Sequence, residues 1–177
     1  MSRLVVDIET NGLLLDVTTF HCAVTYNQDT KEFKEYRPHE LYKLKVDLEK
    51  ASVLIGHNLL GYDLPALAKL CGLEYTGEVI DTLIWAKLLY YDKDKAWSHS
   101  LDAYGERLGE KKGKYSEWEI FTEEMLDYNK QDVVVTQKLY AHLKRKGTWL
   151  GEDSEALKLE QDVQKIVIQQ YITGWRF

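Results

Sequence analysis

Acidic side chains occur in this chain at spacings that could hold a metal ion. Asp7 and Glu9 lie two residues apart in an apolar run that begins at Arg3. Because side chains alternate across a strand, both carboxylates would point to the same face. Tyr128 and Asp132 are four residues apart, which places them on one face of a helix. Such acids need a neutralising partner, and a divalent cation is the simplest candidate, since Mg²⁺ and Mn²⁺ prefer hard oxygen ligands.

A further acid, Asp63, closes the segment 58–63, which reads Asn-Leu-Leu-Gly-Tyr-Asp. The short apolar run just before it, at 52–56, is typical of an interior strand flanked by helices. The end of that strand would deliver residues 58–63 into a loop. Pro65 is well placed in the first turn of a helix expected over about 64–72.

Hydrophobic periodicity and turn signals indicate the elements that position these acids. Residues 3–9 predict a strand, Asn11-Gly12 predicts a turn, and 20–26 with 32–36 predict a hairpin, which together form an antiparallel meander. Further strands are expected at 52–56 and 79–80, and helices at about 39–49, 64–72, 82–91, 100–108, 122–146 and 154–172. Strands first, followed by strand–helix alternation, predict an α/β fold with a mixed sheet.

The longest of these helices contains a local contradiction. Val133-Val134-Val135-Thr136 is β-branched throughout and favours a strand. We still expect a helix over 122–146, because the segment is otherwise rich in helix formers and Gly147 ends it. Asp81 or Thr82 is expected to cap the helix at 82–91.

Composition favours one ordinary globular domain. The 177 residues, 45% of them hydrophobic, suffice for one well-buried core, and no composition shift marks a boundary, so we expect a single domain over residues 1–177. No stretch approaches the roughly 18 apolar residues of a membrane span. Cys22 and Cys71 are expected to be reduced core thiols of a cytoplasmic protein.

The charge balance is acidic. The chain has 29 acidic and 23 basic residues, a net charge of −6, which argues weakly against nucleic-acid binding. Bound divalent cations would reverse the local sign of the field, however. Basic residues cluster at 111–114 and 144–146. They are either solvated surface charges or contacts to a phosphate backbone, and the second interpretation requires that they lie near the acids.

Three segments taken together resemble the motifs of the DEDD exonuclease superfamily, in its tyrosine-bearing subfamily. They are Asp7-x-Glu9, Asn58-x-x-x-Tyr62-Asp63 and Tyr128-x-x-x-Asp132. The flanking residues, including 99–105 and 127–136, are similar to the proofreading domain of family A DNA polymerases of the podovirus bacteriophage type. The resemblance implies a ribonuclease H-like fold, with a mixed five-stranded sheet of three antiparallel and two parallel strands flanked by helices.

The same resemblance implies an enzyme that hydrolyses terminal phosphodiesters of single-stranded DNA from the 3′ end with two divalent ions, Mg²⁺ or Mn²⁺. By position, Asp7, Glu9 and Asp132 would hold the metal that activates water, and Asp7 would bridge to the second metal. Asp63 would hold that second metal. Tyr128 would orient the attacking water. A phenol with an ordinary pKa of about 10 is a poor general base, so lowering the pKa of the water falls to the metal.

Four further residues are candidates for substrate contact. Asn58 would hydrogen-bond the substrate or hold its own loop in place. His57 is either a supporting core histidine or a phosphate contact. Leu13 would wedge against the terminal base, as the equivalent position does in the family, or pack in the core. Tyr62 would pack beside Asp63 or stack on a nucleotide.

The end of the chain, residues 154–177, resembles the segment where a family A polymerase enters its thumb. We therefore expect a separately encoded or separately expressed proofreading exonuclease, located in the cytoplasm of the host if it is viral. Its last helix, with Trp175 and Phe177, would expose apolar surface for a separate or covalently linked polymerase domain. No membrane partner is expected.

Two other functions remain open. The same chemistry could act on RNA, since only contacts at the 2′-OH would distinguish the two substrates. A non-catalytic module that binds single strands or a polymerase is the other alternative. Four convergent carboxylates argue against it, because a pure binder has no use for them.

Overall fold

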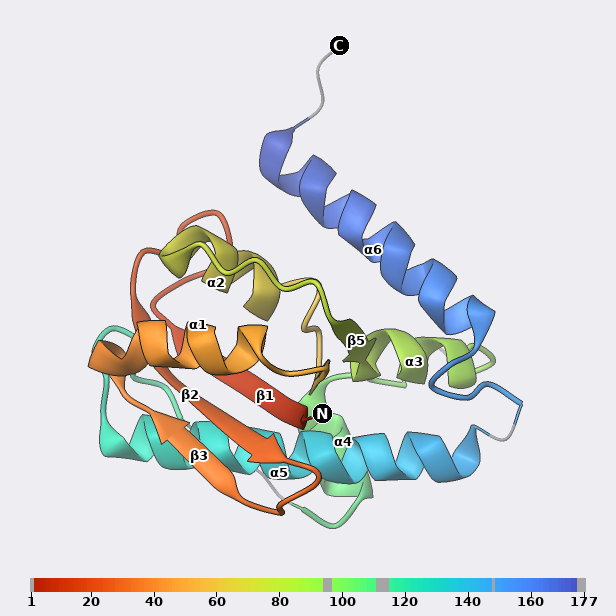
Figure 1. Ribbon diagram of the computed structural model, residues 1–177. Helices are drawn as coiled ribbons and strands as arrows, with labels where there is room; N and C mark the ends of the chain where they lie inside the picture. Colours follow the sequence, from red (N-terminus) through yellow and green to blue (C-terminus); the bar gives the residue numbers. More distant parts are fainter. Residues whose placement is uncertain (1, 94–96, 111–114, 148, 175–177) are drawn as a thin grey trace.

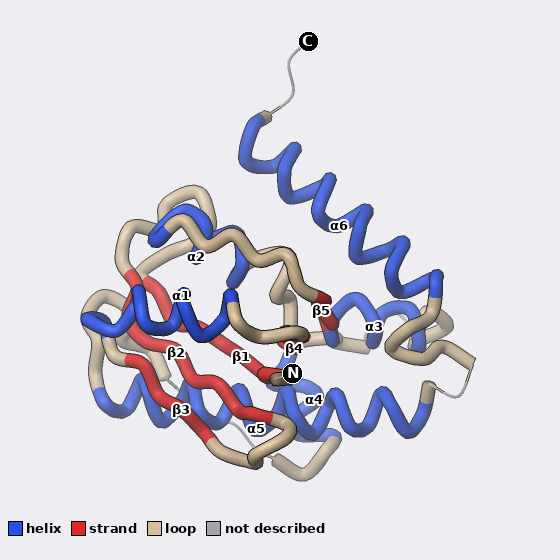
Figure 2. Tube along the Cα trace, in the orientation of Figure 1, coloured by secondary structure: helices blue, strands red, loops and turns tan. Residues whose placement is uncertain are grey.

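A five-stranded mixed sheet forms the centre of the molecule (Figures 1 and 2). The computed structural model describes residues 2–93, 97–110, 115–147 and 149–174. The strands are β1 (Arg3–Thr10), β2 (Phe20–Asn27), β3 (Phe33–Tyr36), β4 (Val53–Gly56) and β5 (Glu78–Asp81), in the order β3-β2-β1-β4-β5. The strands β1, β2 and β3 pair antiparallel, whereas β4 is parallel to both β1 and β5. The expected mixed sheet, with its antiparallel meander, is confirmed.

Helices cover both faces of this sheet. They are α1 (Leu41–Glu49), preceded by the 3₁₀ turn η1 (Pro38–Glu40), α2 (Asp63–Cys71), α3 (Thr82–Leu89), α4 (Leu101–Arg107), α5 (Glu123–Lys146) and α6 (Glu155–Thr173). Helix α5 packs along β1 and β2 on one face, and α1 and α2 lie on the other (Figure 1). The odd-numbered residue Val5 of β1 is buried towards α5, and its even-numbered neighbours Leu4 and Val6 are buried towards α1 and α2. This alternation places Asp7 and Glu9 on the α5 side.

The β-branched run inside α5 is helical, as expected. Val133, Val135 and Thr136 are fully buried against the sheet and the helices around it. Burial of these side chains outweighs the small helix-propensity penalty of branching at Cβ, which is a few tenths of a kcal/mol per residue. Thr122 caps the helix by accepting a hydrogen bond from the backbone of Met125.

Two predicted boundaries differ from the structure in ways that concern the acids. Asp63 was expected in a loop, but it is the first residue of α2, where a carboxylate is favoured by the helix dipole. The helix expected over 39–49 is divided, because η1 precedes α1 and the Arg37 backbone N–H is held by the Glu40 carboxylate.

At α3, Asp81 supplies the cap, accepting hydrogen bonds from the backbones of Leu83 and Ile84.

Helix α6 packs on the body through one face only. Leu157 and Gln161 are buried, whereas the opposite face exposes Leu159, Val163, Ile166 and Val167. In Figure 1 this helix runs from α3 away from the sheet towards the C-terminus. The expected apolar surface on the last helix is therefore present, while Trp175 and Phe177 lie outside the described residues.

Three other expectations concern the whole chain. Cys22 and Cys71 are unpaired and buried, as predicted. Among the helices that the structure describes, none is long and apolar enough to cross a membrane. The basic cluster at 111–114 lies outside the described ranges.

Candidate active site

Strand β1 and helix α5 bring three carboxylates together. Asp7 and Glu9 from β1 and Asp132 from α5 each offer an oxygen, and these oxygens all lie within 4.8 Å of one another. Asp7 and Glu9 share a face because strand side chains alternate, as the sequence predicted. Helix α5 crosses this face, so that one of its turns presents Asp132 to the strand. The side chain of Asp132 is buried, and those of Asp7 and Glu9 are partly exposed.

The same helix supports this group with a neutral amide. Asn129 is fully buried, and its Nδ2 donates a hydrogen bond to Oδ2 of Asp7 at 2.7 Å. One turn before Asp132, Tyr128 lines the same cavity. Sequence analysis singled out Tyr128 and Asp132 but missed Asn129, although its position three residues before Asp132 places it on the same helix face.

Asp63 approaches from the other side of the sheet. It opens α2, and its Oδ1 accepts a hydrogen bond from the backbone N–H of Ile8 at 3.2 Å. Burial raises the pKa of the Asp63 carboxyl well above its ordinary value, and the negative charges of Asp81 and Glu9 raise it further. A buried acid in this position is destabilised as an anion until a cation neutralises it.

A second buried acid, Asp81, shapes the loop that leads to Asp63. Its carboxylate accepts hydrogen bonds from the backbone N–H groups of Asn58 at 3.1 Å and Leu60 at 3.0 Å. Asn58 adopts a left-handed backbone conformation with a φ of 66°. A Cβ at Gly61 would lie 2.3 Å from Oδ1 of Asn58, so a larger residue there would displace the Asn58 side chain. Asp81 is thus a positioning residue that sequence analysis recognised only as a helix cap.

The four candidate substrate-contact residues are placed differently. His57 and Asn58 line the cavity of the acids, and His57 is held by Oγ1 of Thr82 and the backbone carbonyl of His99. Tyr62 also lines it, and its hydroxyl donates to the carbonyl of Gly12. Leu13 is 75% exposed, so the alternative that it packs in the core is wrong.

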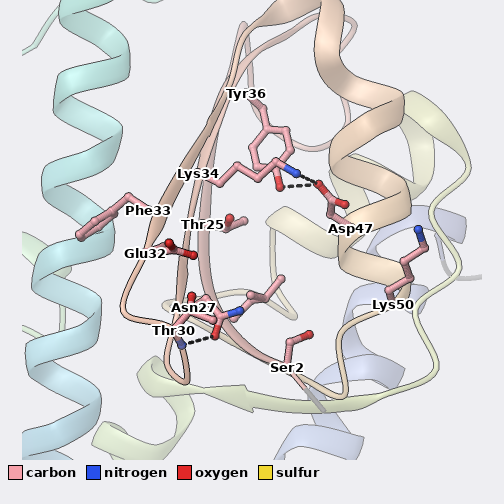
Figure 3. A pocket seen from close by; sticks show the side chains of 11 residues that line it. Ser2, Thr25, Asn27, Thr30, Glu32, Phe33, Lys34, Tyr36, Asp47 and Lys50 are labelled. Carbon is pink, nitrogen blue, oxygen red and sulfur yellow. Dashed lines mark hydrogen bonds and ion pairs between the residues drawn. The ribbon is translucent and has the colours of Figure 1, made fainter.

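One open cavity of about 250 Å³ contains the acids. It is lined by Asp7, Ile8, Glu9, His57, Asn58, Tyr62, Asp63, Trp118, Tyr128 and Asp132. All five residues of the predicted catalytic set are in this lining, together with Trp118, which sequence analysis did not single out. A larger hollow of about 570 Å³ lies on the α1 side of β2 and β3 (Figure 3). There Asp47 is already paired with Lys34 and Tyr36, so this hollow does not offer a comparable group of acids.

The donor set fits a divalent cation. The grouped ligand atoms are all carboxylate oxygens, with no sulfur or imidazole, which matches the preference of Mg²⁺ and Mn²⁺. Asp63, in the same cavity, adds a further oxygen donor.

Comparison with known proteins agrees with this geometry. A family model described as 3′–5′ exonuclease matches residues 2–148, which include all the acids of the cavity. The chain belongs to this 3′–5′ exonuclease family, that of the family A DNA polymerases. Members of the family are hydrolytic nucleases, and the resemblance seen in the three motifs is confirmed.

Its curated relatives include two bacteriophage enzymes. The DNA-directed DNA polymerases of Escherichia phage T7 and Enterobacteria phage T3 are each 37% identical to it over 184 residues, covering 79% of this chain and 26% of the relative. The chain therefore spans about a quarter of the length of these relatives.

Solved structures of the same fold include two bacterial proteins. NrnC from Brucella melitensis with bound Mg²⁺ has a TM-score of 0.72 and 21% identity, with 98% of this chain and 86% of that chain covered. RNase D from Escherichia coli, described as an exoribonuclease involved in structured RNA processing, has a TM-score of 0.67 and 19% identity, with 92% and 45% covered. At these identities the similarity establishes the fold, which is ribonuclease H-like as expected.

The basic cluster at 144–146 is remote from this cavity. It closes α5, and Lys144 lies about 18 Å along the helix axis from Asp132. Lys144 is also engaged with Glu152 at 3.2 Å. The basic cluster at 144–146 does not lie near the acids, so it does not satisfy the requirement for a phosphate contact beside them.

Proposed function

We propose that the chain is a metal-dependent 3′→5′ exodeoxyribonuclease of the proofreading type, which releases nucleoside monophosphates from the end of single-stranded DNA. The observation that carries this proposal is the convergence of Asp7, Glu9 and Asp132 within 4.8 Å in a cavity that also contains Asp63 and Tyr128. The relatives at 37% identity are DNA polymerases, which favours DNA over RNA.

In this proposal each acid has a distinct place. Asp7, Glu9 and Asp132 would hold one divalent cation, and Asp63, with Asp7, would hold the second. The two cations, Mg²⁺ or Mn²⁺, would lower the pKa of the attacking water and neutralise charge on the leaving oxygen. Asn129 holds one oxygen of Asp7 by a hydrogen bond, which restricts the orientation of that carboxylate.

The reaction itself is a hydrolysis. Water adds to the terminal phosphorus, the bond from phosphorus to the 3′ oxygen of the preceding nucleotide breaks, and that oxygen takes up a proton. Tyr128, one turn before Asp132, would orient the attacking water through its hydroxyl. His57, Asn58, Tyr62 and Leu13 are proposed to contact the strand end. His57 and Tyr62 also form hydrogen bonds within the protein, so we propose that they support the shape of the site as well as contact the strand.

A polymerase domain is the proposed partner, either separate or covalently linked. The apolar face of α6 formed by Leu159, Val163, Ile166 and Val167 offers it a surface. Support comes from the relatives, which are whole DNA polymerases of which this chain spans about a quarter.

Digestion of an end-labelled oligonucleotide tests the activity, its polarity and its metal dependence together. We expect stepwise loss of nucleotides from the 3′ end in Mg²⁺ or Mn²⁺, and none in EDTA. Asp7→Ala and Asp132→Ala should lower the rate by more than about 100-fold while the fold is kept, because each removes a proposed metal ligand. Asp127→Ala is the matched control, since Asp127 is an exposed neighbour on α5.

The substrate class is tested with DNA and RNA of one sequence. Faster digestion of DNA supports the proposal, whereas equal or faster digestion of RNA identifies an exoribonuclease, the activity named for RNase D. An Asp7→Ala protein that digested DNA at the wild-type rate would exclude the proposed site. Binding that persists in EDTA, with no turnover in either metal, would identify a non-catalytic module.

A further inference from the structure

Helix α6 contributes a buried polar side chain to the body of the molecule, although it lies beyond residues 2–148, which the family model matches. The two buried residues of α6, Leu157 and Gln161, are four apart and therefore share one face of the helix. Leu157 joins the core cluster that contains residues of α3 and α5. Gln161 makes a polar contact instead, because its Oε1 accepts a hydrogen bond from the backbone N–H of Asp81 at 2.7 Å.

This hydrogen bond meets a need that arises from the sheet. Strand β5 is the last in the sheet order and pairs with β4, so the N–H groups on its outer side have no partner within the sheet. Asp81 ends β5 and is 1% exposed, so water has little access to its N–H. A buried N–H without an acceptor costs stability, and the side-chain oxygen of Gln161 removes that cost. A hydrophobic residue at position 161 would leave the group unpaired.

Asp81 in turn holds the segment that leads to Asp63. It lies opposite Gly56, the last residue of β4, in the parallel register. Its carboxylate accepts hydrogen bonds from the backbone N–H groups of Asn58 and Leu60. Asp63 follows this segment by three residues and opens α2. A displacement of Asp81 would therefore be passed to the backbone that carries the Asp63 carboxylate.

We propose that Gln161 is a positioning residue for the metal site and that α6 thereby belongs to the catalytic unit. The inference rests on the proposed function, in which Asp63 holds one of the two cations. Gln161 is not among the described residues that line the cavity, so it acts through Asp81. Metal ligands must be held within about 0.5 Å of their productive positions, which requires support from the residues behind them. Losing this support should lower metal affinity and nearly preserve the rate at saturating metal, because Asp63 itself remains.

A metal titration of the hydrolysis rate tests this expectation. Gln161→Met removes the oxygen acceptor but keeps a side chain of similar length. The loss of one hydrogen bond should raise the Mg²⁺ concentration for half-maximal rate by roughly 3- to 10-fold. The rate at saturating Mg²⁺ should stay within about 3-fold of the wild type.

Leu157→Ala is the matched control for this titration. It weakens the packing of the same face of α6 and leaves the oxygen of Gln161 in place. We expect its half-maximal Mg²⁺ concentration to match the wild type. An unchanged value in Gln161→Met, or an equal rise in Leu157→Ala, overturns the inference.

Amide hydrogen exchange in the metal-free protein follows the contact itself. Gln161→Met should speed exchange at Asp81, Asn58 and Leu60 more than at Leu48 in α1, because only the first three depend on the position of Asp81. Leu157→Ala should not single out these three amides. A uniform change in Gln161→Met would mean that only overall stability has fallen, and the positioning role would be wrong.

Binding of Mn²⁺ without DNA, measured by electron paramagnetic resonance, keeps this result separate from the activity. If the wild type binds Mn²⁺ but hydrolyses no DNA, and Gln161→Met alone binds more weakly, the proposed function fails and the positioning role stands. Equal binding by wild type, Gln161→Met and Leu157→Ala refutes the positioning role whatever the activity. If Gln161→Met does not fold, the wild type supplies the test: by linkage, Mg²⁺ must slow exchange at Asp81 more than at Leu48, and equal slowing refutes the role.

Discussion

At the scale of single residues, Asn129 shows how a neutral side chain can organise acids. It is fully buried, its Nδ2 donates to Asp7, and its Oδ1 has no hydrogen-bond partner among the described residues. Burying an unsatisfied amide oxygen costs stability. The contact with Asp7 gives a reason to retain the amide, since an aliphatic residue would fill the space but leave the carboxylate unrestrained.

We therefore expect Asn129→Ala to lower the hydrolysis rate by roughly 10- to 100-fold and to raise the Mg²⁺ concentration needed for half-maximal rate, as loss of a residue that orients a metal ligand does. Asn129→Asp should be at least as severe, because it places a second carboxylate against Asp7. Metal titrations of the rate measure both effects, with Asp127→Ala as control. A wild-type metal dependence in Asn129→Ala would refute the positioning role.

At the scale of elements, Asp81 joins β5, α3 and the loop 58–61. It accepts hydrogen bonds from four backbone N–H groups, those of Asn58, Leu60, Leu83 and Ile84. Its own N–H donates to Oε1 of Gln161 on α6 at 2.7 Å. Burial raises the pKa of this carboxyl, while the four N–H groups oppose that rise.

Asp81→Ala would leave these backbone groups without an acceptor. Losing a helix cap costs about 1 kcal/mol, and buried unsatisfied donors cost about 1–3 kcal/mol more. We expect the free energy of unfolding, measured by urea denaturation, to fall by about 3 kcal/mol. Ser100→Ala, which removes the cap of α4, should cost only about 1 kcal/mol. Equal losses in the two variants would contradict this account of Asp81.

Glu152 links the start of β1 to the end of α5 and is expected to make stability depend on pH. It lies 3.1 Å from Arg3 and 3.2 Å from Lys144, and Tyr140 also donates to it. Burial alone would raise the pKa of the Glu152 carboxyl, but the hydrogen bonds from Tyr140 and Lys144 outweigh it, and the pKa is lowered below its ordinary 4.5. The stabilisation is therefore complete above that ordinary value and is lost as the pH falls through the lowered pKa.

Glu152→Gln should lower the free energy of unfolding by about 1 kcal/mol near neutral pH. The difference from wild type should shrink towards zero as the pH falls below the lowered pKa, where both side chains are neutral. Denaturation curves over this pH range measure it, with the exposed Glu160→Gln as control. A difference that did not vary with pH would show that the charge of Glu152 contributes nothing.

Most elements followed from local pattern, and the exceptions have a physical cause. The apolar run that begins at Arg3 identified β1, and the absence of helix breakers outweighed the branched run of α5. Asp63 was misplaced by one residue, because loop and first helical turn look alike in sequence before Pro65. The contacts of Asn129 and Asp81, and the place of Trp118 in the cavity, could not be predicted from sequence alone, since they depend on residues far away in the chain.

At the scale of the whole molecule, α6 has two apolar faces but only one of them is packed. Leu157 is fully buried, whereas Leu159, two residues further on, is 62% exposed. Two residues along a helix turn the side chain to nearly the opposite side. The helix is therefore attached to the body by its inner face, and its outer face remains available.

Alanine substitutions at these two leucines make a matched pair. Leu157→Ala should lower the free energy of unfolding by about 2–5 kcal/mol, the usual cost of truncating a buried leucine. Leu159→Ala should change it by less than about 0.5 kcal/mol. Thermal or urea unfolding measures both. Similar losses at the two sites would mean that α6 packs in solution through both faces.

The central position of β1 in the sheet has a consequence for how the enzyme would fail on heating. This strand pairs with β2 from Leu4 to Thr10, a span that includes Asp7 and Glu9, and with β4 from Arg3 to Val5, so it lies inside the sheet and cannot fray as an edge strand does. Amide protons in such a strand exchange with solvent only when the whole domain opens. Asp7 and Glu9 would keep their spacing until that point, so thermal inactivation and global unfolding should occur in a single transition.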